Sequence, residues 1–240
     1  MADPIEPHLS ALSSPDPARR LAAAAALEQA LQAEQESGRT DWEPLTARLL
    51  PVLIRGLGDP EKGVQVHTAN CLQLLARHSG AVIPALRQAM GGTNRRRAWG
   101  AALVSARLGL WLPEMRHALS DAMSAQDRDL RWAAAQLALA LGWSHPEAVE
   151  MVVETLQSPD PTARKMAAYC LGGMGAYTAV EAPLTGALRD PHREVRRAAL
   201  LALNRLPSLS PEAIRQMALL RFDPDPQVRR TAEAVTGRRR

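Results

Sequence analysis

The stretch Asp190-Pro191-His192-Arg193-Glu194-Val195-Arg196-Arg197-Ala198-Ala199-Leu200-Leu201-Ala202-Leu203 decides the fold of this 240-residue chain. It has the pattern of a short helix. Asp190 is expected to cap the helix N-terminus with its carboxylate, and Pro191 suits the first helical position, where no N–H is needed. Arginines and then small apolar residues follow the proline, and this order of residues defines a unit that can be searched for elsewhere in the chain.

The same unit recurs six more times. Asp-Pro copies start at Asp16, Asp59, Asp160 and Asp225, and weaker copies start at Asn94 and Asp127. Aligned on the first basic position, the seven copies lie at Arg19, Gln65, Arg96, Arg131, Arg164, Arg196 and Arg229, which are 46, 31, 35, 33, 32 and 33 residues apart. A period in this range predicts a stacked array, because one repeat cannot bury its apolar face alone.

A second apolar-periodic helix precedes each of these anchor helices. The sequence predicts the preceding helices at 44–57, 81–90, 113–123, 146–156, 179–188 and 211–220, and the first anchor helix at 17–36. Short loops between the two sets predict about seven antiparallel helix pairs in one all-α solenoid. Within it, residues 1–43 form an atypical N-terminal capping repeat, 44–221 the repeat array, and 222–240 a C-terminal helix with a basic tail.

Composition agrees with closely packed helices. Apolar residues make up 46% of the chain and aromatic residues only 3%, so the interior is expected to consist of small aliphatic side chains. Cys71 and Cys170 occupy the same core column, which argues against a disulfide between such distant repeats. The first residues lack the basic and apolar regions of a secretory signal, and no segment approaches the roughly 18 apolar residues of a membrane span. These features predict a cytoplasmic protein.

The recurring order of Asp-Pro, an apolar residue, Arg, a basic residue and paired small residues resembles the HEAT repeat. Arg189-Asp190-Pro191 through Leu203 is most similar to the short HEAT-like repeats of the phycobilisome-lyase type, and the resemblance covers nearly the whole chain. The tetratricopeptide pattern and the Thr-Pro-Leu-His turn of ankyrin repeats, which have similar periods, are absent from the sequence.

This resemblance implies a right-handed solenoid whose anchor helices line the concave face. It also implies that the capping aspartate and the anchor arginine form a ladder between adjacent repeats, so Arg164, Arg196 and Arg229 are expected to be structural. The position after the anchor holds Arg20, Val66, Arg97, Trp132, Lys165, Arg197 and Arg230. Five of these seven residues are basic without a ladder partner, which indicates either a binding surface or an ordinary solvated helix face.

Charge alternates along the chain, although the formal net charge is only +4. Residues 62–113 contain seven basic residues and no acidic one, and residues 189–240 contain twelve basic and six acidic residues, ending in three arginines at 238–240. Acidic residues are in excess in the two remaining blocks, 1–61 and 114–188. The basic blocks would create separate positive patches able to attract a polyanion or the acidic surface of a protein.

The densest basic cluster is Arg95, Arg96 and Arg97, which follows two glycines, Thr93 and Asn94 at a predicted helix N-terminus. Such an arrangement suits a phosphate or carboxylate, and the alternative is a glycine-terminated helix followed by an ordinary cap. Trp99 lies at or beside a small-residue column, and Trp132 lies in the basic column. Aromatic rings beside arginines can stack on bases or anchor a protein partner, although either tryptophan can also be buried.

Enzyme motifs are missing. The alkylpurine DNA glycosylases, which share the HEAT-like architecture, place a catalytic aspartate one turn after a tryptophan, whereas this sequence has Leu103 and Gln136 there. The His-Glu pairs of HEAT-like deoxyhypusine hydroxylases and other metal, nucleotide and nucleophile motifs are also absent, so we expect no cofactor, no metal and no catalysis.

Two functions remain. The first is a non-enzymatic scaffold or adaptor that binds a protein partner, with an acidic surface as a suitable complement, on its concave face. The alternative is a sequence-independent binder of DNA or RNA. The residues expected at either interface are Arg95, Arg96, Arg97, Trp99, Trp132, Lys165, Arg197 and Arg230. A bilin-lyase subunit rests on family naming alone. No membrane partner is expected, and the oligomeric state is left open.

Overall fold

The computed structural model describes residues 5–174 and 180–237, which form seven helix pairs. The first helices of the pairs are α1 (Glu6–Ala11), α3 (Glu43–Gly56), α5 (Val82–Met90), α7 (Met115–Met123), α9 (Pro146–Thr155), α11 (Glu181–Ala187) and α13 (Pro211–Leu219). The second helices are α2 (Pro17–Glu36), α4 (Lys62–Leu75), α6 (Arg95–Arg107), α8 (Arg128–Gly142), α10 (Pro161–Gly173), α12 (Arg193–Arg205) and α14 (Pro226–Gly237). The predicted all-α solenoid of seven pairs is confirmed.

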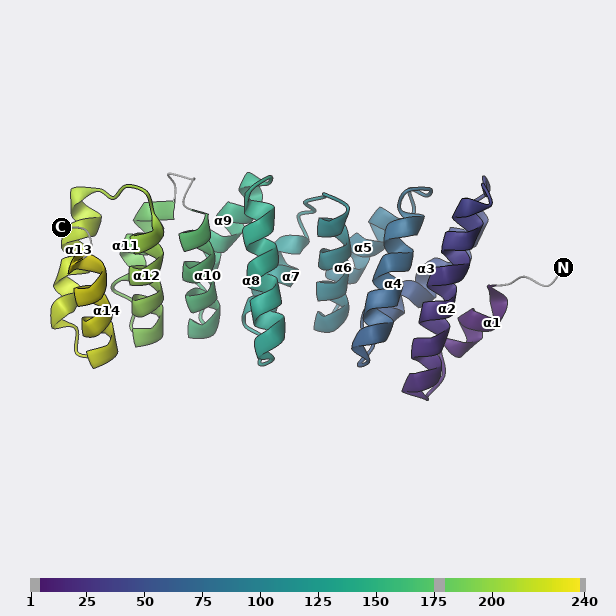
Figure 1. Ribbon diagram of the computed structural model, residues 1–240, viewed down its shortest axis with the longest axis horizontal. Coiled ribbons are helices and arrows are strands. Elements are labelled where there is room, and N and C mark those ends of the chain that lie inside the picture. Colours follow the sequence, from purple (N-terminus) through teal and green to yellow (C-terminus); the bar gives the residue numbers. More distant parts are fainter. Residues whose placement is uncertain (1–4, 175–179, 238–240) are drawn as a thin grey trace. The chain divides into compact units, whose positions relative to one another are not determined.

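Contacts divide the chain into two compact units, Met1–Ala118 and Leu119–Arg240, with the boundary inside α7. In the first unit, α4 packs between α2 and α6, and α3 and α5 lie behind this row (Figure 1). The six-residue helix α1 packs on α2, and Ile5, the residue before α1, is buried. The sequence does not predict α1, because six residues are too few for a helical period to be recognised.

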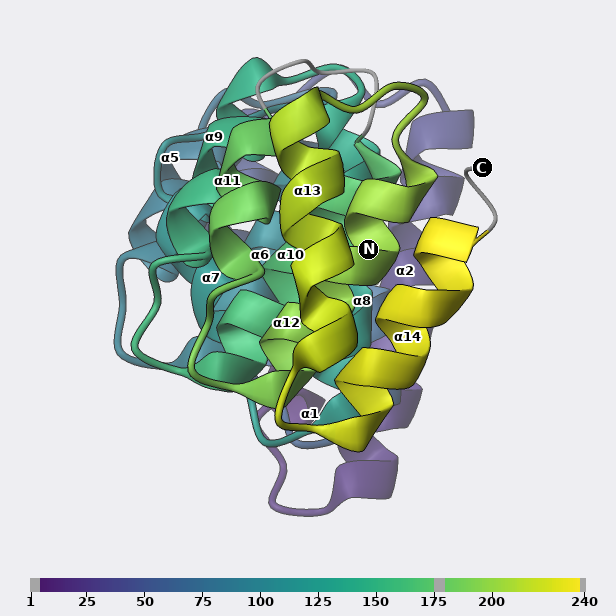
Figure 2. The ribbon, with the colours of Figure 1, turned by 90° about the vertical axis from the view of Figure 1, so that its left-hand side faces the viewer.

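In the second unit, α8, α10, α12 and α14 pack in sequence as one layer, and α9, α11 and α13 form the other (Figure 1). Seen from the C-terminal end, α13 and α14 form the last pair, in front of α11 and α12 (Figure 2). Trp132 of α8 and Leu201 of α12 remain exposed, so the layer of second helices is not covered on all sides.

Small side chains allow the second helices to pack side by side. A small buried residue lies seven positions after the N-cap residue of each second helix, and at most 4% of its surface is exposed. The column consists of Ala23, Thr68, Ala101, Ala134, Ala167, Ala199 and Ala232. Such side chains suit close helix contacts, which explains the low aromatic content of the chain.

Both cysteines belong to this core, as predicted. Cys71 and Cys170 are buried and free. Burial raises the pKa of the Cys170 thiol to about 12 and also raises the pKa of Cys71, so neither is a thiolate at neutral pH. Within residues 5–174 and 180–237, no helix has both the length and the apolar content needed to cross a membrane.

Candidate functional site

A recurring arginine fixes the loop before five of the seven second helices. At α10, Asp160 caps the helix by accepting the Thr162 N–H at 2.8 Å, and Arg164, four residues after the cap, donates Nη1 to the carbonyls of Ser158 (2.9 Å) and Pro159 (3.1 Å). The same pair of carbonyl bonds is made by Arg20, Arg131, Arg196 and Arg229. We call these five residues the ladder arginines. Their bonds satisfy carbonyl groups that the loop would otherwise leave unpaired.

Three ladder arginines also bind an aspartate of the following repeat through a bidentate pair of bonds. Arg164 donates Nε to Asp190 Oδ2 at 2.7 Å and Nη2 to Oδ1 at 2.9 Å. Equivalent pairs join Arg20 to Asp59 and Arg196 to Asp223. All six side chains are at most 13% exposed, so these charge-assisted bonds are well shielded from water. The predicted ladder between adjacent repeats is therefore present at three places.

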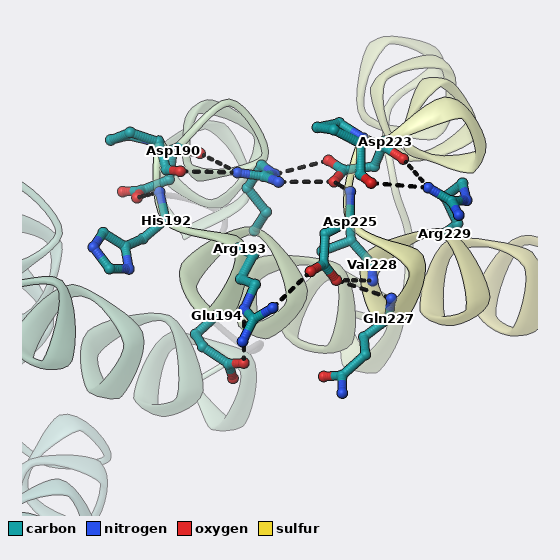
Figure 3. Close-up of polar contacts among 12 residues, drawn as sticks. Asp190, His192, Arg193, Glu194, Asp223, Asp225, Gln227, Val228 and Arg229 are labelled. Carbon is teal, nitrogen blue, oxygen red and sulfur yellow. Dashed lines mark hydrogen bonds and ion pairs between the residues drawn. The ribbon is translucent and has the colours of Figure 1, made fainter.

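The ladder aspartates lie two residues before the caps of their helices. The residue at the cap of α12 is His192, and Asp190 accepts the His192 N–H at 2.8 Å. The prediction that Asp190 caps this helix and that Pro191 begins it is therefore wrong. Before α14 both kinds of aspartate occur: Asp223 belongs to the ladder, whereas Asp225 caps the helix by accepting the N–H groups of Gln227 and Val228 (Figure 3).

The ladder makes the stability of the fold depend on pH. Burial opposes ionisation of Asp190, but hydrogen bonds from Arg164 and the His192 N–H outweigh it and lower the pKa of Asp190 below its ordinary 3.8. The pKa values of Asp59 and Asp223 are lowered in the same way. A lowered pKa stabilises the fold above the unfolded value, and this stabilisation disappears as the pH falls through the folded value.

We therefore expect the free energy of unfolding of wild type to exceed that of Asp190→Asn by a constant amount from pH 7 to pH 5. The difference should shrink below about pH 4, as the carboxyl is protonated in both states. Urea unfolding across this pH range measures the difference. A gap that stays constant into strong acid would show that the Asp190 carboxylate is not what stabilises the contact.

Counting from the caps corrects the predicted register. The ladder position is four residues after the cap, and it holds Arg20 in α2 and Ala98 in α6. Arg20 and Arg97 therefore do not belong to the column that follows the anchor. This column, which we call the face column, holds Leu21, Val66, Trp99, Trp132, Lys165, Arg197 and Arg230. Three of its residues are basic, not five. Trp99 is the counterpart of Trp132 and is half-buried, while Ala101 occupies the small-residue column.

The arginine cluster of the first unit lies at the start of α6. Asn94 caps this helix by accepting the Arg97 N–H at 2.9 Å, as the sequence predicts for the cap. Arg95 and Arg96 are exposed, whereas Arg97 is half-buried beside a hollow of about 770 Å³, and its Nε is buried without a hydrogen-bond partner among the described residues. An anion-binding role for the cluster remains a prediction.

The second unit brings three of the predicted residues together in a groove. Trp132 of α8, Lys165 of α10 and Arg197 of α12 line a hollow of about 280 Å³ on the open side of the second-helix layer. We call it the face groove. Its complete lining is Trp132, Lys165, Met166, Tyr169, Glu194, Arg197, Ala198, Leu201, Ala202 and Arg205.

Aromatic and cationic groups contact one another inside the face groove. The ring centroids of Trp132 and Tyr169 are 4.9 Å apart, and the Arg205 guanidinium lies 5.3 Å from the centre of the Tyr169 ring. Such contacts orient the rings and the cation. Trp132 is 49% exposed and Leu201 is 43% exposed, so apolar surface remains open to a ligand.

Tyr169, Leu201 and Arg205 also line the face groove, but they are not among the residues predicted from the sequence. A signal was available, because Tyr169 and Leu201 lie four residues after Lys165 and Arg197, and Arg205 lies four residues further. Residues four apart share one face of a helix. Of the other predicted residues, Arg230 is exposed on α14 and does not line the face groove, Trp99 and the arginine cluster belong to the first unit, and Arg238 to Arg240 lie outside the described residues.

Metal ligands do not gather in the described ranges, where no group of three or more His, Cys, Asp or Glu side chains is placed to hold an ion. His67 and Cys71 share one face of a helix, but His67 pairs with Glu28, whose Oε2 lies 2.7 Å from His67 Nδ1. Glu28 also accepts a bond from Asn70 at 3.0 Å. This polar cluster joins α2 to α4 within the first unit.

Comparison with solved structures supports the fold. The crystal structure of Cex1p aligns with 98% of this chain and 52% of that chain, at 15% identity and a TM-score of 0.56. A structure of Kap95p bound to RanGDP aligns with 97% of this chain and 35% of that chain, at 13% identity and a TM-score of 0.62. The chain thus spans about half of the Cex1p chain. At these identities the similarity shows the fold alone.

The sequence comparison gives a family for part of the chain. Residues 117–204, from α7 to α12, match the model of the HEAT-repeat family. No curated protein matches the chain. The finer resemblance to repeats of the phycobilisome-lyase type stays a prediction. Together, the comparisons support an α-solenoid fold, in which residues 117–204 match the HEAT-repeat family.

Proposed function

We propose that this chain is a non-enzymatic scaffold that binds a segment of a partner protein on the open side of its second-helix layer. The observation that carries the proposal is the face groove between α8, α10 and α12. The fold is compatible with this role, since Kap95p, which has a similar fold, binds RanGDP. Fold alone does not assign function, so the argument rests on the chemistry of the groove.

The lining of the face groove resembles the centre of a protein interface. Tryptophan, tyrosine and arginine dominate protein hot spots, and all three residue types occur here beside exposed Leu201. Three cations, Lys165, Arg197 and Arg205, face one acid, Glu194. The partner segment should therefore combine acidic residues with aliphatic or aromatic side chains.

Nucleic acid fits the structure less well. Arg20, Arg164 and Arg196 are occupied by ladder aspartates and cannot serve a phosphate backbone without breaking the ladder. The corrected face column holds three basic residues, all in the second unit, and its other four positions are apolar or aromatic. DNA or RNA binding is therefore the alternative outcome of the test and not the function we propose.

The test starts from a displayed library of random 12-residue peptides selected on the immobilised full chain. We expect enrichment of peptides that combine Asp or Glu with Leu, Phe or Trp. In fluorescence anisotropy, Leu201→Asp should weaken binding of an enriched peptide at least tenfold, because it places a carboxylate in the apolar part of the face groove. The matched control is Ile214→Asp, which changes a similarly exposed apolar residue (49%) on α13, in the other layer.

Two results would contradict the proposal. One is the absence of any enrichment, or an equal loss of binding in both variants, with circular dichroism confirming that they fold. The other is binding of a labelled 15-nucleotide single strand that is tighter than the binding of any enriched peptide and has the steep salt dependence of phosphate contacts. That second result, together with its loss in Arg95→Glu/Arg96→Glu/Arg97→Glu, would favour the nucleic-acid function.

A further inference from the structure

Two ladder arginines of the second unit, Arg131 and Arg229, make no pair with an aspartate among the described residues. Arg131 donates Nη1 to the carbonyls of Ala125 (2.6 Å) and Gln126 (2.8 Å), as the other ladder arginines do in their own loops. Within the described residues, its Nε and Nη2 have no partner. These are the two groups with which Arg164 and Arg196 bind Asp190 and Asp223. Arg131 therefore presents an open guanidinium fork.

The position of the missing carboxylate can be identified. Ladder pairs in this unit join residues 26 and 27 positions apart. Position 158, 27 residues after Arg131, is a serine in the sequence Ser158-Pro159-Asp160, which parallels Asp190-Pro191-His192 and Asp223-Pro224-Asp225. Ser158 Oγ accepts the Asp160 N–H at 3.2 Å, the same backbone bond that the ladder aspartates make with their cap residues. Ser158 thus keeps the loop conformation but supplies no carboxylate.

The open fork lies beside a cationic hollow. Arg128, Asp129, Arg131, Trp132, Lys165 and Met166 line a space of about 400 Å³ at the start of α8. Three of these side chains are cations and one is an acid. Trp132, Lys165 and Met166 also line the face groove, so the two hollows adjoin on the same layer. A peptide in the face groove can therefore extend an acidic side chain to Arg131.

We propose that Arg131 is a carboxylate-binding site, and that an Asp or Glu side chain of the partner takes the place that Asp190 takes at Arg164. This inference rests on the proposed function for the identity of the partner, but not for the site itself. The fork is already held in position by two carbonyl bonds, so little side-chain entropy remains to be lost when a carboxylate binds. Lys165 and Arg128 add positive charge around the bound group.

Arg229 does not qualify on the same evidence. It makes the same two carbonyl bonds, to Asp223 at 2.8 Å and Pro224 at 3.0 Å. The hollows of the second unit described above do not include Arg229. The site is therefore assigned to Arg131 alone.

The substitution Ser158→Asp tests the site by supplying the missing carboxylate from within the chain. We expect the new aspartate to pair with Arg131 and to raise the melting temperature by about 2–4 °C. Ser158→Asn, which has nearly the same size but no charge, is the matched control and should give a much smaller rise. The absence of a difference between Asp and Asn would overturn the inference, because the fork would not have the geometry of the ladder.

Binding is measured directly with N-acetylaspartate as the probe. In NMR spectra of the arginine Nε–H groups of the full chain, the Arg131 signal, identified by its loss in Arg131→Lys, should shift saturably in wild type and in Ser158→Asn. In Ser158→Asp the signal should be displaced from the start and insensitive to the probe. An Arg131 signal that does not respond in wild type would overturn the inference, whether or not any peptide binds the chain.

Peptides selected on the immobilised full chain separate the two proposals. Ser158→Asp should weaken binding of an acidic selected peptide at least tenfold. It should not change the affinity of the matching peptide in which each Asp is replaced by Asn and each Glu by Gln. If Leu201→Asp abolishes binding but Ser158→Asp does not change it, the face groove binds peptides and the role of Arg131 is wrong. If no peptide is selected but N-acetylaspartate binds at Arg131, the carboxylate site stands and the proposed scaffold function fails.

Discussion

Gly172→Ala is expected to lower the free energy of unfolding by about 2 kcal/mol, although alanine is the better helix former. A Cβ atom added at Gly172 of α10 would lie 2.7 Å from Ala202 Cα and 2.8 Å from Ala202 Cβ of α12. The nearest atom belongs to the backbone, so it cannot swing aside as a flexible side chain would. The two helices must separate, and their small-residue contact is lost. Urea unfolding monitored by circular dichroism measures the change.

Gly186→Ala provides the matched control for this prediction. Gly186 lies in α11, and no atom lies within 4 Å of the place a Cβ would take. The substitution should therefore leave stability unchanged or raise it by up to about 1 kcal/mol through helix propensity. Equal effects of the two substitutions would mean that close approach of α10 to α12 does not limit the residue at position 172.

Arg164→Met should lower the free energy of unfolding by about 2–3 kcal/mol, because it leaves the shielded carboxylate of Asp190 without its bidentate partner. Arg131→Met is the matched comparison. Both substitutions remove two bonds to loop carbonyls, but only Arg164 also binds an aspartate of the following repeat. We therefore expect Arg131→Met to cost about 1 kcal/mol.

The difference between the two variants isolates the contribution of the ladder carboxylate. It should disappear when Arg164→Met is made in an Asp190→Asn background, since the carboxylate is then no longer stranded. If Arg131→Met proves as costly as Arg164→Met, the carbonyl bonds alone account for the stabilisation, and the ladder aspartates contribute little. Thermal and urea unfolding of wild type, the three single variants and the double variant provide this comparison.

The repeat architecture could be predicted from the sequence because it depends on local and periodic information. The seven copies of the unit, the helix boundaries at Pro17, Pro146 and Pro211 and the buried positions of Cys71 and Cys170 all follow from propensity, capping and spacing. A single repeat cannot bury its apolar face, so periodicity alone requires the copies to stack.

Register within the repeats could not be predicted in the same way. Asp-Pro occurs with two meanings, as a cap followed by the first helical residue at Asp225 and as a ladder aspartate before the cap at Asp190. The two differ by two residues, and the partner that distinguishes them, Arg164, lies in another repeat. A pattern of residue types does not contain that long-range contact. In the arginine runs 19–20 and 95–97 it also does not show which position is the anchor, so the predicted column is wrong for Arg20 and Arg97.

An array of paired helices with a small-residue core follows from the residues alone, since turn chemistry and helical period act within each repeat. Which arginines are paired and which surface is open depends on contacts between repeats. Lys165, Arg197 and Trp132 line one groove because three separate helices place them there. Among the described residues, Arg131 has no carboxylate partner, because the next repeat has Ser158 where an aspartate would close the ladder. Both features arise only where the helices of neighbouring repeats pack against one another.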